Sequence, residues 1–248
     1  MDRIIYTAGG GAARVLEQQA TISNNLANAT TTGFREQLAL QRSVYVRSAD
    51  TPVTRVASLS TTPGSNFAQG VLNETGRPLD LAIRGEGWFT VQKGDEQVFT
   101  RAGEFTVNAN NQLVSSNGHW VLSIDDAPIE IPERGSVTFG ADGTISAIGA
   151  GDNPSDIQEV GRLKLVNPDL QQLRRGDDGY FRMADNAYVA ADENVGVVSG
   201  FLEKSNVSVA QTMVGLIQNA RHFETQMKVI QQASSNAERA NSILASGH

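Results

Sequence analysis

A long heptad stripe near the C-terminus constrains this chain more than any other feature. Eleven positions alternate at steps of four and three residues: Val209, Met213, Leu216, Ala220, Phe223, Met227, Ile230, Ser234, Ala237, Asn241 and Leu244. Nine of them are apolar, and the stretch contains no proline. A narrow stripe with a period of 3.5 residues predicts a helix of about 36 residues that packs against another helix in a coiled-coil-like pair.

The N-terminal segment supplies a candidate partner for that helix. From Ile4 to about Asn28, apolar or small residues recur at the same steps, with one polar interruption: Ile5, Ala8, Ala12, Val15, Gln19, Ile22 and Leu26. Three glycines, Gly9 to Gly11, lie inside this segment. Each costs about 1 kcal/mol of helix propensity relative to alanine, so we expect this helix to be weak by itself.

Between the two ends the chain changes to short apolar or alternating runs. These runs predict strands at Leu79–Ile83, Trp88–Val91, Phe105–Val107, Leu113–Val114, Val121–Ile124, Val137–Phe139 and Leu163–Val166. The dipeptides Asn117-Gly118, Asp142-Gly143 and Asp178-Gly179 predict hairpins whose two turn residues both have positive φ. Residues 47–70 have no helical period and are rich in Ser, Thr, Ala and Pro, which indicates an extended connector.

The expected fold class is therefore α+β. Long N- and C-terminal helices pair as a coiled-coil-like domain, and the centre forms an all-β domain. The expected divisions are an N-terminal helix and turn at 1–35, an extended connector at 36–70, a β domain at 71–200 and a C-terminal helix at 201–248.

Composition and charge exclude several classes of protein. The net charge is −7, and each end carries +1, which leaves −9 in the centre. Nucleic-acid partners are not expected, because phosphate binding needs a clustered basic surface. We expect no membrane insertion, because no window reaches the roughly 18 consecutive apolar residues of a membrane helix. The first residues contain no apolar core of a cleaved secretion signal, so any export is expected to use another route.

Catalytic and metal-binding motifs are not recognisable either. The chain has no cysteine, and no two of its three histidines have the i, i+4 spacing of a zinc site. Gly85-Glu86-Gly87 lacks the residues that continue a phosphate-binding loop, and no nucleophile elbow occurs. We expect no catalytic residue, cofactor or metal, although paired carboxylates for glycan cleavage have no sequence signature that would decide the matter.

Four segments, in order along the chain, carry a family resemblance. Ser23–Arg35, Gly76–Val91, Phe99–Asn108 and Ser199–Val209 resemble the signature segments of bacterial flagellar rod and hook proteins. The opening residues and Asn219–Gln231 are most similar to proximal-rod members. The resemblance rests on these motif residues: Asn25, Leu26, Asn28, Gly33, Phe34, Arg77, Pro78, Leu79, Gly87, Phe89, Arg101, Gly103, Leu202, Glu203, Ser205, Asn206 and Val207.

The resemblance implies a structural subunit of the proximal rod. Such a subunit leaves through the type III export apparatus without cleavage, and joins a tubular drive shaft across the periplasm with its terminal helices innermost. Its partners would be copies of itself and other proximal and distal rod proteins. The residues expected to pack between subunits are Ile5, Ala8, Ala12, Val15, Ile22, Leu26, Val209, Met213, Leu216, Ala220, Phe223, Met227, Ile230 and Leu244.

Three alternatives stay open at this point. The chain could be a distal rod or hook-type axial subunit, which would share the same motifs. It could be a periplasmic enzyme that acts on peptidoglycan, or a soluble β-domain binding module with helical adaptors.

Overall fold

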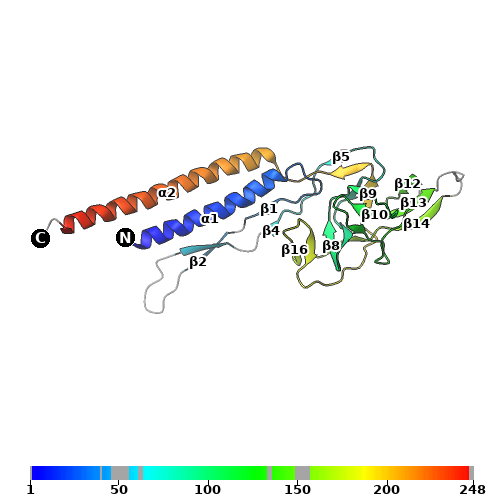
Figure 1. The fold of residues 1–248 in the computed structure, drawn as a ribbon, viewed down its shortest axis with the longest axis horizontal. Helices are drawn as coiled ribbons and strands as arrows, with labels where there is room; N and C mark the ends of the chain where they lie inside the picture. The colour runs from blue at the N-terminus through cyan, green and yellow to red at the C-terminus, as the bar shows by residue number, and fades with distance from the viewer. Residues whose placement is uncertain are drawn as a thin grey trace. The chain divides into compact units, whose positions relative to one another are not determined.

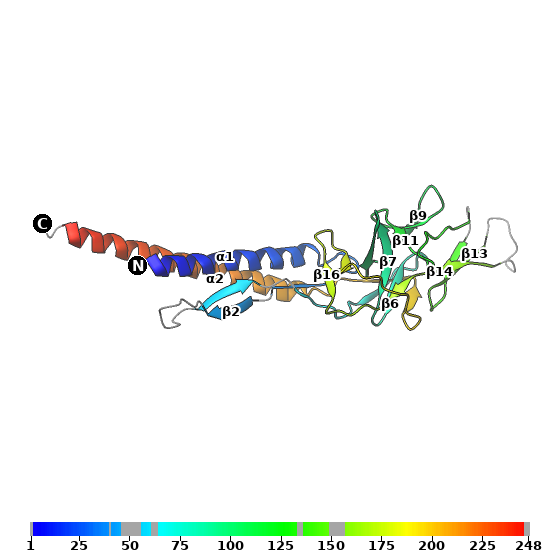
Figure 2. The ribbon, with the colours of Figure 1, turned by 90° about the horizontal axis from the view of Figure 1, so that it is seen from below.

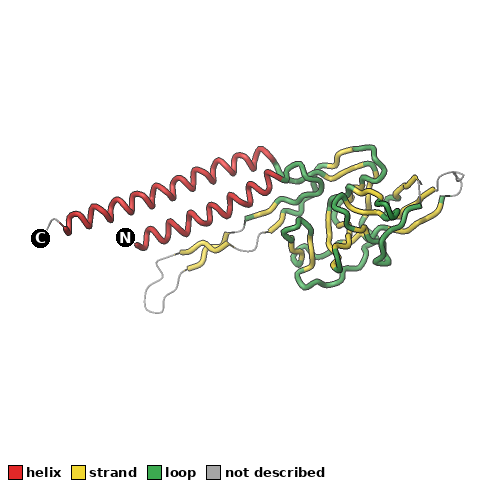
Figure 3. Tube along the Cα trace, viewed as in Figure 1, coloured by secondary structure: helices red, strands yellow, loops and turns green. Residues whose placement is uncertain are grey.

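The computed structural model describes residues 2–39, 41–45, 56–60, 64–132, 136–148 and 157–245. It divides into two compact units. The helical unit comprises Met1–Ala29, Glu36–Asn66 and Val207–His248, and the β unit comprises Thr30–Arg35 and Phe67–Asn206. The chain therefore passes from one unit to the other four times. Among the described residues, Figure 3 shows helices in the helical unit alone.

Two long antiparallel helices, α1 (Asp2–Ala27) and α2 (Val209–Ala245), form most of the helical unit (Figure 1). Asn219 Nδ2 on α2 donates a hydrogen bond of 2.8 Å to the Val15 carbonyl on α1. α2 is 37 residues long and α1 is 26. The two helices observed agree with the α+β class expected from the heptad stripes.

The three successive glycines do not interrupt α1, which is helical from end to end. A Cβ atom added at Gly11 would lie 3.2 Å from the Gln226 side chain of α2, whereas nothing lies within 4 Å of such an atom at Gly9 or Gly10. Gly11 therefore makes room for α2, and the other two glycines face open space.

The segment expected to be an extended connector contains two antiparallel strand pairs. β1 (Gln37–Leu38) pairs with β4 (Gly64–Ser65), and β2 (Gln41–Tyr45) pairs with β3 (Val56–Ser60). Residues 46–55 and 61–63, which were included in that expectation, lie outside the described residues.

An antiparallel sheet of eight strands forms the centre of the β unit (Figure 2). Its order is β16-β17-β8-β7-β11-β10-β9. An eighth strand, β15, pairs with the first residues of β7, and β11 pairs with residues further along β7. Its strands are β7 (Trp88–Lys93), β8 (Glu96–Thr100), β9 (Phe105–Val107), β10 (Leu113–Ser115), β11 (Trp120–Val121), β15 (Leu165–Val166), β16 (Leu173–Arg175) and β17 (Phe181–Met183).

Smaller sheets complete the unit. They are a three-stranded sheet of β12 (Ser136–Phe139), β13 (Thr144–Ile148) and β14 (Gln158–Arg162), the pair β6 (Leu81–Arg84) with β18 (Gly196–Ser199), and the pair β5 (Leu72–Glu74) with β19 (Phe201–Glu203). All of these pairs are antiparallel.

Strand β7 is buried on both faces, because its alternate residues enter two different apolar clusters. Phe89 and Val91 belong to the larger cluster, and Trp88 belongs to the smaller one with Phe99 and Phe181. This explains why the first four residues of β7, Trp88 to Val91, are all buried and do not alternate between buried and exposed.

All three dipeptides expected to form hairpins do so, but with a different turn. Only the glycine of each pair has positive φ, with values of 80° at Gly118, 86° at Gly143 and 84° at Gly179. In each hairpin the glycine amide donates to the carbonyl three residues earlier, for example Gly143 to Gly140 at 3.0 Å. This is a type I turn followed by a left-handed glycine, so the expectation of two positive φ angles was wrong.

Candidate functional site

The expected packing residues of α1 all lie on its less exposed sides. Ala8 and Ala12 are buried, and Ile5, Val15, Ile22 and Leu26 are half-buried. On α2 the expected residues divide into two groups. Leu216, Phe223 and Ile230 are half-buried, whereas Val209, Met213, Ala220 and Met227 are exposed. The side chain of Leu244 lies outside the described part of the chain.

The division arises because the line of α2 that contacts α1 is displaced by one residue at every second step. It contains Asn219, Gln226 and Ala233 in place of Ala220, Met227 and Ser234, and Asn219 and Ala233 are buried. Asn219 Nδ2 also lies 3.3 Å from Gln19 Oε1, so polar groups occupy part of the contact. Sequence reasoning missed these residues because it selected apolar side chains. Their mutual spacing of seven was the available signal.

Displacement of the contact leaves an apolar stripe on α2, which we call the open face: Val209, Met213, Ile217, Ala220 and Met227. At about 100° per residue, these residues lie on one flank of the helix and Gln218 lies on the opposite flank. Met213 is 50% exposed and Ile217 is 54% exposed. The stripe is apolar from Val209 to Ala220, and Glu224 interrupts it before Met227. An exposed apolar stripe of this kind is typical of a surface that another protein covers.

Motif residues of the helical unit hold the chain that leaves α1. Asn25 is buried, and its side chain forms two hydrogen bonds with the backbone of Gln37, one donated by Nδ2 (2.9 Å) and one accepted by Oδ1 (2.8 Å). Asn28 Nδ2 donates to the Asn24 carbonyl at 2.9 Å, and Val207 is buried. The amide of Asn25 therefore fixes the start of β1 as a neighbouring strand would.

Motif glycines in the β unit allow close backbone contacts. A Cβ atom at Gly33, where φ is 68°, would lie 2.3 Å from the Arg101 carbonyl carbon. One at Gly103 would lie 1.7 Å from the Leu81 oxygen, and one at Gly87 would clash with Val195. No other residue fits these positions without a shift of the backbone or the core.

The other motif residues of the β unit stabilise its loops and core. Arg77 Nε donates to Asp80 at 2.9 Å, the Pro78 carbonyl accepts from Ser199 at 2.9 Å, and the Leu79 carbonyl accepts from Phe105 at 3.3 Å. The remaining motif positions are the core residue Phe89, the buried Phe34, and the half-buried Leu202, Ser205 and Asn206.

Three buried charges meet beside Trp88. Glu203 Oε1 lies 2.7 Å from Arg35 Nη2, and Glu203 Oε2 accepts from Arg101 Nη1 at 3.0 Å. Burial lowers the pKa of Arg101 to about 10, an effect that Glu203 opposes and Arg35 reinforces. Arg35 was not among the predicted residues, although it ends the first motif. Its partner is 168 positions away, and local sequence patterns do not report such a pairing.

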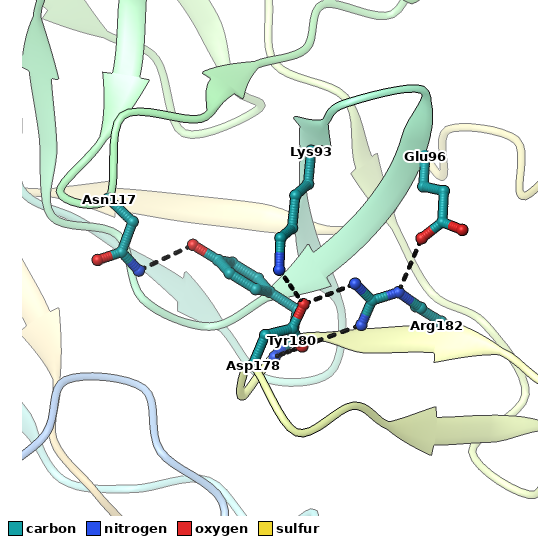
Figure 4. A network of polar contacts seen from close by, with 6 residues as sticks. All are labelled: Lys93, Glu96, Asn117, Asp178, Tyr180 and Arg182. Atoms are coloured by element: carbon teal, nitrogen blue, oxygen red, sulfur yellow. Dashed lines mark hydrogen bonds and ion pairs between the residues drawn. The ribbon is translucent and has the colours of Figure 1, made fainter.

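A second polar cluster joins three hairpins of the sheet (Figure 4). Asp178, between β16 and β17, accepts hydrogen bonds from Arg182 (2.6 Å) and from Lys93 at the end of β7. Asn117, between β10 and β11, donates to the Tyr180 hydroxyl at 3.0 Å. The bonds from Arg182, which outweigh the opposing effect of burial, hold the pKa of Asp178 well below its ordinary value.

The described part of the chain contains no helix that could cross a membrane. It also contains no group of three or more His, Asp or Glu residues placed to hold a metal ion.

Three regions of the chain, at both ends and in the centre, match known protein families. The N-terminal region, residues 5–35, matches the family described as flagella basal body rod protein. Residues 82–147 match the flagellar hook protein FlgE/F/G D1 domain, and residues 198–243 match the flagellar basal body rod FlgEFG protein C-terminal region.

Curated relatives match over almost the whole chain. The flagellar basal-body rod protein FlgF of Salmonella typhimurium is 43% identical over 251 residues, which cover 98% of this chain and 99% of the relative. FlgF of Escherichia coli K12 gives the same identity and coverage. The flagellar basal-body rod protein FlgG of Bacillus subtilis is 29% identical, over 93% of this chain and 94% of the relative. The chain thus belongs to the family of flagellar basal-body rod proteins, as a structural subunit of that rod.

Proposed function

We propose that the chain is a subunit of the proximal part of the rod and that it assembles through its terminal helices. The 43% identity to the FlgF proteins of Salmonella typhimurium and Escherichia coli, against 29% to the FlgG protein of Bacillus subtilis, supports the proximal position over a distal rod or hook position. The open face of α2 supports assembly through the helices, and it is the observation that carries this proposal.

In this proposal α2 has two working sides. One side packs against α1 within the chain as a coiled-coil-like pair, and the open face packs against helices of neighbouring subunits. Burying a Val, Met or Ile side chain fully stabilises a contact by about 1.5–3 kcal/mol, so the five residues of the open face could supply a stable lateral contact. Leu16 on α1, which is 54% exposed, would add to the surface.

The expected neighbours are copies of this chain and the other proximal and distal rod proteins. The chain would reach them through the type III export apparatus, without a cleaved signal, and would act in the periplasm as part of the drive shaft. A purely mechanical role needs no catalysis, cofactor or metal. The expected division was a helix and turn at 1–35, a connector at 36–70, a β domain at 71–200 and a C-terminal helix at 201–248. We propose the same functional parts with the bounds of the two compact units, which place residues 30–35, 67–70 and 201–206 in the β unit.

The substitution Met213→Asp tests the proposal. It places a carboxylate on the open face, where docking of a neighbouring helix would bury it without a partner at a cost of several kcal/mol. Because Met213 is half exposed in the single chain, the subunit itself should fold normally. We expect a secreted, soluble protein that is absent from purified basal bodies by immunoblot, in cells that do not swim.

Gln218→Asp is the matched control, because the same charge then lies on the opposite flank of the same turns of α2. This variant should incorporate and support swimming. Normal incorporation of Met213→Asp would show that the open face is not an assembly surface.

A further inference from the structure

One carboxylate, that of Glu203, joins four segments of the β unit. Its side chain is fully buried. Oε1 accepts a hydrogen bond from the Gly70 amide at 2.7 Å and lies 2.7 Å from Arg35 Nη2, and Oε2 accepts from Arg101 at 3.0 Å. The four residues that meet here, Arg35, Gly70, Arg101 and Glu203, are all more than 30 positions apart in the sequence.

Further hydrogen bonds join the same segments. The Gly33 amide donates to the Glu203 carbonyl at 2.7 Å, and the Lys204 amide donates to the Val71 carbonyl at 2.9 Å. Asn206 Nδ2 donates to the Ala68 carbonyl at 2.8 Å. Residues 30–35, 67–71 and 201–206 are the segments by which the chain enters and leaves the β unit. All four passages between units therefore start from segments that meet around Glu203.

The electrostatics favour a carboxylate at this position. Two buried guanidinium groups, of Arg35 and Arg101, lie 5.8 and 5.3 Å from the centroid of the Trp88 ring. Within the described structure, Arg35 Nε, Nη1 and Nη2 have no hydrogen-bond partner, so Arg35 meets Glu203 as an ion pair without hydrogen-bond geometry. A buried charge is tolerated when a well-placed opposite charge compensates it, and Glu203 forms an ion pair with each of the two guanidinium groups.

We propose that Glu203 is a positioning residue that locks the entry and exit segments of the β unit to one another. Load carried by the terminal helices would then reach the sheet through several joined segments instead of single strands. Support for the lock comes from contacts inside the β unit. Its role under load depends on the proposed function in the rod.

Hydrogen exchange of the full-length chain tests the lock. In Glu203→Gln, the amide side chain can still accept from Gly70, but its NH₂ group faces the donor of Arg101 and its charge is lost. We expect the amides of residues 30–35, 67–71 and 201–206 to exchange about tenfold faster or more, while β7 and β8 stay protected. The control Glu193→Gln, at an exposed carboxylate of the same unit, should change neither set.

A uniform loss of protection across the sheet would mean that Glu203 merely stabilises the fold, and unchanged protection of the three segments would mean that there is no lock. If Glu203→Gln fails to fold, Arg101→Met decides the matter. Since the Arg35–Glu203 pair and the Gly70 bond remain, residues 30–35 and 67–71 should stay protected in Arg101→Met. Their opening in this variant would contradict the proposal.

Swimming assays separate the lock from the proposed function. Cells with Glu203→Gln should incorporate the subunit and swim normally in dilute medium, but slow more than the wild type as viscosity rises. An equal response to viscosity, with the exchange result intact, would overturn the role under load. Normal swimming of cells that lack the protein altogether would instead refute the proposed function.

Discussion

Single glycines set how closely segments of this chain approach one another. Gly33, Gly87 and Gly103 have no space for a side chain, and Gly11 leaves room for Gln226 on α2. Gly9 and Gly10 differ from these, because a Cβ atom at either position would meet nothing within 4 Å. They weaken α1 without a packing reason visible in the single chain.

Substituting the two unconstrained glycines should therefore stabilise α1. We expect Gly9→Ala and Gly10→Ala each to add about 1 kcal/mol of helix stability, because alanine loses less backbone entropy on folding. Circular dichroism of the purified chain should show more helix and a higher melting temperature of the helical signal. Gly11→Ala should gain less, since the Gln226 side chain must move. Equal gains at all three positions would contradict the contact with α2.

At the scale of elements, the hairpins of the sheet are held by charged side chains at their turns. The Asp178 carboxylate bonds to Arg182 within the β16–β17 hairpin, and its bond to Lys93 joins this hairpin to the end of β7 (Figure 4). His119, in the β10–β11 turn, packs against Tyr180 with ring centroids 5.4 Å apart. Burial, helped by Lys93, lowers the pKa of His119.

These pKa shifts predict that the β unit is destabilised by acid. A lowered pKa in the folded state contributes stability above the unfolded pKa, and the contribution is lost as the pH falls through the folded value. The loss should begin below about pH 6.5 for His119 and below about pH 3.9 for Asp178. Because Asp178 is exposed and solvent screens its ion pairs, Asp178→Asn should lower the free energy of unfolding at pH 7 by about 1 kcal/mol or less.

Denaturant titrations between pH 7 and pH 3 measure this effect. The difference between the wild type and Asp178→Asn should shrink as the pH falls below about 3.9. Asp177→Asn, an exposed neighbour, should match the wild type throughout. A difference that stays constant with pH would show that the charge of Asp178 is not the source of its effect.

At the scale of the whole molecule, the two units differ in what stabilises them. The β unit contains both apolar clusters and the buried charges, whereas the helical unit leaves the open face of α2 in solvent. Helices of this kind derive most of their stability from tertiary packing, and neighbouring subunits would supply the rest.

Limited proteolysis of the dilute monomer should therefore remove α1 and α2 and leave the β unit. Because Arg35 contributes to the buried charges, we expect the resistant species to retain residues 30–35 together with 67–206. Intact mass spectrometry under native conditions would identify it, including a product nicked between residues 36 and 66. A full-length chain that resists cleavage, or a stable core that begins at Val71, would contradict this division.

The amino-acid sequence by itself determined the two long helices, the β-rich centre and the family, because each depends on local periodicity or on motifs. Strands such as β7 and the turns at Gly118, Gly143 and Gly179 follow from runs of apolar residues and from glycine. Tertiary structure alone decided which flank of α2 contacts α1, and it selected Asn219 over Ala220 because packing depends on geometry as well as hydrophobicity. It also brought Arg35 and Arg101 to Glu203, since ion pairs between distant segments leave no local pattern in the sequence.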